Sequence, residues 1–167
     1  MKHLSWLVCA AAFVIAAAAQ IDLKNPPPPP EQPIPYSHKK HVGELKLKCN
    51  MCHPNKEPGE VMGIPQASTC MTCHTAVKTD SAAIQKLAEY AKANRQIPWR
   101  RVYQVPGYVF FSHKAHLQTG ATCETCHAKV ADAEMVFKAT DISMGGCMTC
   151  HRVKNAPLDC SFCHEQR

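Results

Sequence analysis

The sequence has little of what usually fills a protein interior, and it lacks several features that would point to other functions. Aromatic residues make up only 7% of its 167 residues, and Leu, Ile and Phe are too few for a large apolar core in a chain of this length. No apolar run reaches the roughly 20 residues that span a bilayer as a helix. The net charge is +6, but no basic run with interleaved aromatics accompanies it, so the chain does not resemble a nucleic-acid-binding protein. Something other than apolar side chains must therefore fill the interior.

The N-terminus has the pattern of an export signal. A short basic start precedes the apolar residues 4–19, and alanines end this run before Gln20, as at a signal cleavage site. Residues 1–19 are therefore predicted to be a signal peptide, which places the rest of the chain in the periplasm or another extracytoplasmic space. Cys9 lies inside the run after the bulky Val8, which is wrong for a lipid-attachment cysteine. Without cleavage, the same run would associate the chain with a membrane.

The remainder divides into a linker and one domain with an internal repeat. Residues 20–35 are rich in proline and predict an extended, stiff segment, either a spacer or a passive linker. Residues 36–167 form the predicted domain, with halves at 36–94 and 95–167. The repeated segments are Tyr36-Ser37-His38-Lys39-Lys40-His41 and Phe111-Ser112-His113-Lys114-Ala115-His116. Residues 81–94 predict a helix with one apolar face, and residues 102–111 are β-prone.

Every cysteine beyond Cys9 lies in a CxxCH motif. The five motifs are Cys49, Cys52 and His53; Cys70, Cys73 and His74; Cys123, Cys126 and His127; Cys147, Cys150 and His151; and Cys160, Cys163 and His164. This is the sequence form of c-type haem attachment. In one helical turn the two sulfurs share a face, where they can form thioethers, and the histidine supplies an axial iron ligand. Disulfides would not require a histidine after each pair, and structural zinc would leave those histidines unused. The motifs predict five covalently attached haems.

The other histidines of the domain form two HxxH pairs. They are His38 with His41 and His113 with His116, which we predict to be distal iron ligands. The two members of a pair lie on one helix face, so they cannot flank one haem and must serve two irons. Four distal histidines for five irons leave one haem with another ligand or with an open position. Methionine is the usual substitute.

Within the predicted domain, three methionines lie outside the CxxC loops: Met62, Met135 and Met144. Met144 stands just before Cys147, and we predict it as the fifth distal ligand. The alternative for any of these methionines is gap-filling against a haem edge.

These observations predict a small, haem-cored, mostly irregular fold with short α-helices and little β structure. Haems with two axial histidines suit electron transfer rather than substrate binding, so the predicted function is an electron relay between redox partner proteins and not an enzyme. One alternative is a multihaem oxyanion reductase with one open haem, although the chain has no CxxCK variant and no spare histidine. The other is a haem-holding subunit of a larger membrane complex.

HxxH followed by CxxCH, repeated in a small chain, resembles the class III multihaem cytochromes c. The resemblance implies specific axial pairs, which are His38 with His53, His41 with His74, His113 with His127, His116 with His151, and Met144 with His164. Residues 97–103, 111–113 and 143–145, with Arg152 after His151, also resemble the pentahaem subunit of alternative complex III. That second resemblance implies a membrane quinol-oxidising complex as a partner.

Overall fold

The computed structural model describes residues 26–165, which form short helices joined by irregular loops. No β-strand occurs among these residues, and the β-prone segment 102–111 contains only bends and turns. The fold class predicted from the sequence is therefore confirmed. The helical elements are η1 (Lys39–Glu44), α1 (Cys49–Cys52), α2 (Ala67–His74), α3 (Ala82–Lys92), α4 (His113–Gln118), α5 (Cys123–His127), η2 (Val130–Asp132), α6 (Met144–Lys154) and α7 (Cys160–His164).

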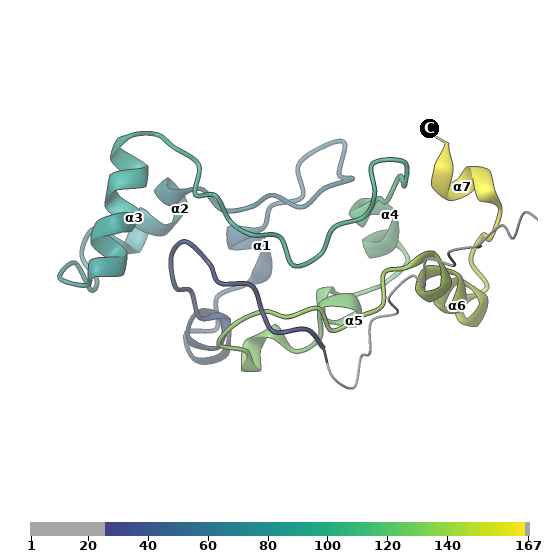
Figure 1. The fold of residues 1–167 in the computed structure, drawn as a ribbon, viewed down its shortest axis with the longest axis horizontal. Helices are drawn as coiled ribbons and strands as arrows, with labels where there is room; N and C mark the ends of the chain where they lie inside the picture. Colours follow the sequence, from purple (N-terminus) through teal and green to yellow (C-terminus); the bar gives the residue numbers. More distant parts are fainter. Residues whose placement is uncertain (1–25, 166–167) are drawn as a thin grey trace, which may run out of the picture.

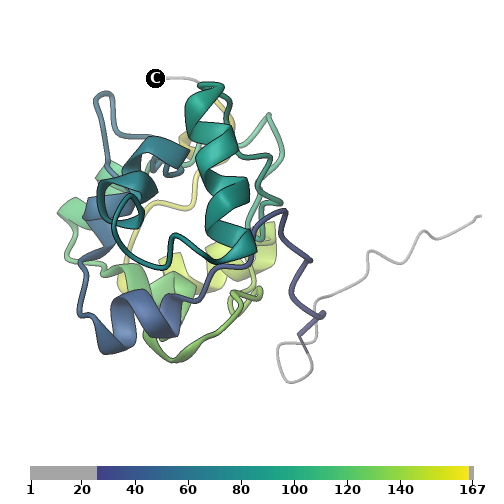
Figure 2. The same cartoon turned by 90° about the vertical axis from the view of Figure 1, so that its left-hand side faces the viewer.

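One end of the molecule has an apolar protein core. Helices α2 and α3 pack against each other there, as Figures 1 and 2 show. The buried hydrophobic residues in the described part of the chain are Ile34, Ala67, Leu87 and Ile97. Helix α3 confirms the helix predicted at 81–94 from its apolar face. It ends at Lys92, before Pro98 stops further helix.

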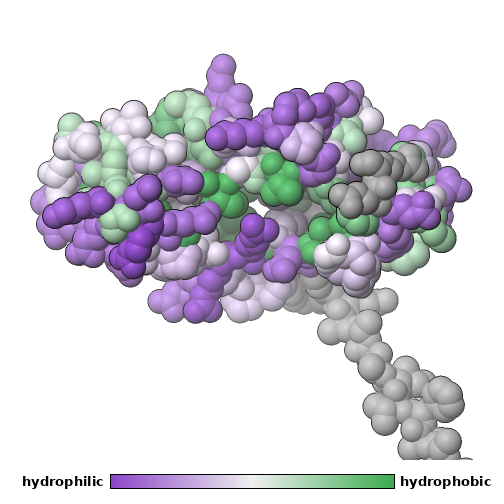
Figure 3. All heavy atoms as spheres, turned by 90° about the horizontal axis from the view of Figure 1, so that it is seen from above, coloured by the Kyte–Doolittle hydropathy of each residue, from purple (hydrophilic) through white to green (hydrophobic). Residues whose placement is uncertain are grey.

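Away from that end, large apolar side chains are exposed to solvent. Large hydrophobic residues of the second half are exposed, among them Tyr108 at 68% and Val153 at 75%. Hydrophobic side chains gather around hollows near the middle of the face in Figure 3. Burying such surface is the main favourable contribution to folding, so this half needs a large apolar group to complete its interior.

The helices that carry the CxxCH motifs follow one another along the long axis of the molecule. Their order in space is α2, α1, α5, α6 and α7 (Figure 1), which differs from their order in the sequence. The two halves meet where η1 packs on η2. Within residues 26–165, no helix has the length and apolar character needed to cross a membrane. The predicted signal at residues 1–19 and the start of the 20–35 linker lie outside the described residues.

Candidate haem-binding sites

All five CxxCH motifs adopt the helical turn that their chemistry requires. Each pair of cysteines lies in its own helix, from α1 to α7, and all ten are free thiols. Spacing of three residues puts the two sulfurs on one helix face. In the described residues, no three His, Cys, Asp or Glu side chains come together to hold a bare metal ion. The helical turn thus places the two cysteines of each motif as thioether attachment of a haem requires.

Most imidazoles are held by a backbone carbonyl at the same ring nitrogen. A carbonyl only accepts hydrogen bonds, so the proton must be on Nδ1 and the lone pair on Nε2, ready for a metal. Seven of the nine described histidines make this bond, at 2.6–3.1 Å. The pairs of histidine and carbonyl residue are His41 with Ser37, His53 with Gly63, His74 with Val77, His113 with Glu60, His116 with Ser112, His151 with Pro157, and His164 with Tyr108.

Three distal candidates lie at the distance expected across an iron. A metal–imidazole bond measures about 2 Å, so two rings on opposite sides of one ion have centroids roughly 6 Å apart. The observed pairs are His38 and His53 at 6.5 Å with an interplanar angle of 8°, His41 and His74 at 6.2 Å and 59°, and His116 and His151 at 6.1 Å and 49°. The two members of the first HxxH pair thus face histidines of different motifs.

The fourth distal candidate, His113, lies beside His127. Burial lowers the pKa of His127, with His113 as the next cause and His53 after it. His38 behaves similarly, because burial followed by His53 and His41 lowers its pKa to about 4. A lowered pKa keeps the imidazole neutral, which is the form that binds a metal.

An aromatic ring covers each HxxH pair in the same way. Tyr36 stacks on His41 at 4.5 Å and meets His38 edge-on at 4.8 Å. Phe111 stacks on His116 at 4.5 Å, and its edge contact with His113 is also 4.8 Å. The repeat seen in the sequence is therefore a repeat of side-chain packing around the distal candidates.

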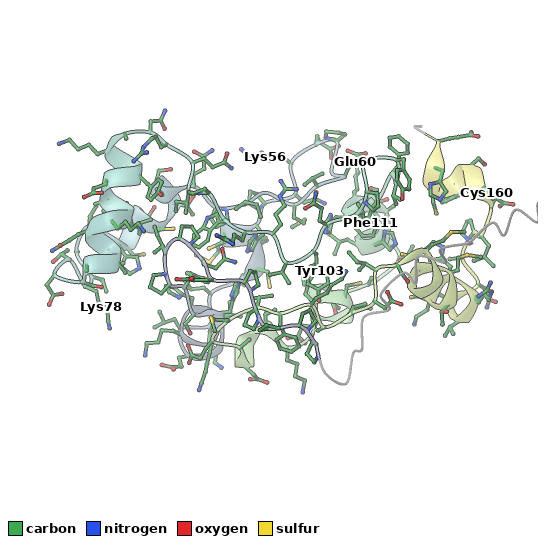
Figure 4. The ribbon with its side chains drawn as sticks, in the orientation of Figure 1. Lys56, Glu60, Lys78, Tyr103, Phe111 and Cys160 are labelled. Atoms are coloured by element: carbon green, nitrogen blue, oxygen red, sulfur yellow. The ribbon has the colours of Figure 1, made fainter. Side chains whose placement is uncertain are left out.

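Tyr103 supports the site of the Cys123 motif, a role that the sequence does not predict. Its hydroxyl donates to the carbonyl of Cys126 at 3.2 Å and accepts from the backbone N–H of Ala139 at 2.8 Å. Its ring meets His127 edge-on at 4.6 Å. Figure 4 shows Tyr103 near the middle of the molecule.

Beside it is a cavity of about 390 Å³, lined by His127 and by mostly apolar residues between 128 and 139, including Val130, Val136 and Phe137. An apolar cavity with an imidazole at its wall fits a haem.

Met144 begins helix α6, and 65% of its surface is exposed. It lies three residues before Cys147 and so on the same face of α6. His164 lies in α7, where its Nδ1 bonds to the carbonyl of Tyr108 and its ring stacks on the Tyr108 ring at 5.9 Å. Met135 is also exposed, at 56%, and Met62 is half-buried. The methionine ligand stays a prediction.

Cysteines of successive helices along the long axis lie close together. Burial raises the pKa of four thiols in three motifs, and the next cause for each thiol is a cysteine of a neighbouring motif. The pairs are Cys70 with Cys52, Cys123 with Cys49, Cys126 with Cys150, and Cys147 with Cys163. Thioethers do not titrate, so these shifts matter here because they identify neighbouring sulfurs. They give the same order of helices as Figure 1: α2, α1, α5, α6, α7.

Comparisons with known proteins identify the family to which the chain is similar. The model of the class III cytochrome c family matches residues 13–97, and the model of cytochrome c7 and related cytochromes c matches residues 109–166. The chain is 31% identical to the multihaem cytochrome c subunit of menaquinone reductase from Nitratidesulfovibrio vulgaris (strain Hildenborough), over 81% of this chain and 77% of that protein. It is 34% identical to cytochrome c3 from Desulfuromonas acetoxidans, over 35% of this chain and 82% of that protein.

Proposed function

The chain belongs to the class III cytochrome c family, and we propose that it carries five haems and passes electrons along them between a quinol-linked membrane complex and a second redox partner. Multihaem electron transfer follows from the family, and c-type haem is its cofactor. The proposal adds the haem number, the ligands, the path and the partners. Its main support is the set of imidazoles that face one another at 6.1–6.5 Å.

We number the haems 1 to 5 by their motifs, from Cys49 to Cys160. The proposed axial pairs are His38 and His53 for haem 1, His41 and His74 for haem 2, His113 and His127 for haem 3, His116 and His151 for haem 4, and Met144 and His164 for haem 5. A haem iron held by each pair would supply one-electron chemistry. The chain holds seven of the nine imidazoles in a fixed tautomer through backbone carbonyls, so that these ligands need not rearrange when the charge changes.

The proposed electron path follows the order of the attachment helices, which is haem 2, 1, 3, 4, 5. At each step of this path, a cysteine of one motif lies beside a cysteine of the next motif. Haems 1 and 3 form the junction between the two halves of the chain, because Cys49 lies beside Cys123 and His53 beside His127. Haems 2 and 5 are the two ends, where partners would deliver and collect electrons.

The partner assignment rests on the relative in a menaquinone reductase and on the resemblance of residues 97–103 and 143–145 to a quinol-oxidising complex. Covalent haem attachment and the signal pattern at residues 1–19 support an extracytoplasmic location. Retention of residues 1–19 would add an association with the membrane.

Mass spectrometry and low-temperature EPR of the holoprotein test the proposal. We expect the mass of five haems, four low-spin centres with two histidines and one centre with histidine and methionine. The pair His38 and His53 is near-parallel at 8° and should give a rhombic spectrum, whereas the pairs at 49° and 59° should give larger g-anisotropy.

Met144→Ala should remove the His/Met signal, and Met135→Ala serves as the matched control. A high-spin signal in the unmodified protein that shifts with nitrite or cyanide would contradict the relay and favour an oxyanion reductase.

A further inference from the structure

The lysine that follows the first histidine of each HxxH pair reaches across to the other half of the chain. The backbone N–H of Lys39 donates to the carbonyl of Ala133 at 2.9 Å, and that of Lys114 donates to the carbonyl of Gly59 at 3.0 Å. The lysines occupy equivalent positions of the repeat. Each half therefore bonds to the other through the same residue of the motif.

The side chains of these two lysines repeat the exchange. Lys114 Nζ lies 2.8 and 3.0 Å from the two carboxylate oxygens of Glu57 in the first half. Lys39 Nζ lies 3.8 Å from a carboxylate oxygen of Glu134 in the second half. In contrast, the neighbouring Lys40 pairs with Glu44 of its own helix η1. Lys39 and Lys114 thus each make one backbone hydrogen bond and one ion pair to the other half, and we call each such pair of contacts a clamp. Lys40 makes its ion pair within its own half.

Beside each clamp, a glycine allows the backbones of the two halves to lie close together. A Cβ on Gly43 would lie 2.3 Å from the carbonyl oxygen of Ala131, next to the Lys39 clamp. A Cβ on Gly59 would lie 2.8 Å from the Cβ of Lys114, and Gly59 also has φ of +93°, which favours glycine. Larger residues at either position would push the halves apart.

The clamps act next to the distal candidates of haems 1 and 3. The Glu60 carbonyl, which follows Gly59, accepts from both the backbone N–H of His113 at 3.1 Å and its Nδ1 at 2.9 Å. Figure 4 shows Glu60 and Phe111 close to α4, which begins at His113. Lys39 directly follows His38. A shift of either lysine relative to the other half would therefore turn the neighbouring imidazole.

We propose that Lys39 and Lys114 are reciprocal positioning residues, through which each half of the chain fixes the first distal histidine of the other half. The inference rests on the proposed ligation of haems 1 and 3. The two halves would then set each other's ligand geometry at the one step where electrons pass between them. Exposed ion pairs contribute little to global stability, so their removal should alter the junction while the fold persists.

Redox titration of the holoprotein followed by NMR, which resolves the haems individually, tests this assignment. Lys114→Met should shift the resonances and midpoint of haem 3, and Lys39→Met those of haem 1, with haems 2, 4 and 5 unchanged. Lys40→Met is the matched control and should shift none of them. Lys114→Arg and Lys39→Arg, which keep the cation, should restore most of the native values.

Glycine variants provide a second test that does not depend on the ion pairs. Gly43→Ala should shift haem 1 and Gly59→Ala haem 3. Gly107, with open space around it, is the control for Gly43, and Gly120, which combines open space with φ of +87°, is the control for Gly59.

Native values in the lysine-to-methionine variants, or equal shifts in all five haems, would overturn the assignment. A holoprotein with fewer than five haems or without two-histidine centres would instead overturn the proposed function, and mass spectrometry and EPR detect that separately.

Discussion

The α2–α3 end and residues 109–165 differ in how their interiors are filled. At the α2–α3 end, four buried side chains from the segment before η1, from α2, from α3 and from the loop after α3 make a small protein core. Residues 109–165 contain no buried hydrophobic residue at all. The first region can begin to fold on its own contacts. The second must obtain its apolar interior from covalently attached haem. The attachment also reduces the number of conformations open to the unfolded chain.

The largest expected effect comes from leaving the haems out. Apoprotein made in the cytoplasm, where haem is not attached, should lose nearly all protection from hydrogen exchange in residues 109–165. Some protection should remain in α3, although isolated helices of 11 residues are marginal in water. Hydrogen exchange measured by mass spectrometry, with the holoprotein as reference, compares the two regions directly. Equal protection of both regions in the apoprotein would contradict the contrast between them.

A side-chain truncation should lower the free energy of unfolding much more in the α2–α3 core than in residues 109–165. Leu87 is 4% exposed at the centre of the α3 packing, so Leu87→Ala should lower the free energy of unfolding by about 2–4 kcal/mol. Val153, at 75% exposed, is the control in the second half, and Val153→Ala should change stability by less than about 0.5 kcal/mol. Denaturant unfolding of the holoprotein measures both. A loss at Val153 equal to that at Leu87 would mean that the second half has a protein core after all.

The Tyr103 hydroxyl offers a smaller and more local test within the second half. Tyr103→Phe removes two hydrogen bonds and leaves the N–H of Ala139 without its acceptor, which should reduce stability by about 1–2 kcal/mol. Because the ring meets His127, the EPR signal of haem 3 should also move. Tyr108→Phe is the control, since the contact of Tyr108 with the His164 imidazole nitrogen is through its backbone carbonyl. An unchanged haem 3 signal would assign Tyr103 to packing alone.

Sequence patterns foresaw those parts of the structure that depend on neighbours along the chain. The apolar spacing around Leu87 predicted α3, and CxxCH predicted a helical turn at each motif. The spacing of HxxH implied that the two rings must face different partners, and the rings of His38 and His41 do so.

The carbonyls that hold the imidazoles were not predictable, because every residue type offers a carbonyl and only the tertiary fold selects Gly63 or Pro157. The same applies to the bonds that Lys39 and Lys114 make across the halves. The ligand roles themselves, above all that of Met144, stay predictions.

The smallest expected effect is on stability at alkaline pH, and it compares Tyr36 with Phe111, the two rings that cover the HxxH pairs. Burial, followed by Cys52 and Cys70, raises the pKa of Tyr36 from 10.0 to about 12, and burial persists when the cysteines become thioethers. The fold thus favours the neutral phenol, so this contribution to stability is present below pH 10.0 and is lost as pH rises toward 12. Tyr36→Phe keeps the stacked ring and should flatten the fall in denaturant midpoint over that range.

Phe111→Tyr makes the reverse change, because it places a phenol in the second copy of the repeat. Phe111 stacks on His116 at the distance at which Tyr36 stacks on His41, 4.5 Å, and both rings are half-buried. If the two copies enclose the ring equally, the new phenol should add an alkaline loss of stability like that of Tyr36, and the double variant Tyr36→Phe with Phe111→Tyr should resemble the native protein. No added loss from Phe111→Tyr would mean that the second copy lets water reach the ring edge, as expected of residues 109–165, which contain no buried hydrophobic residue.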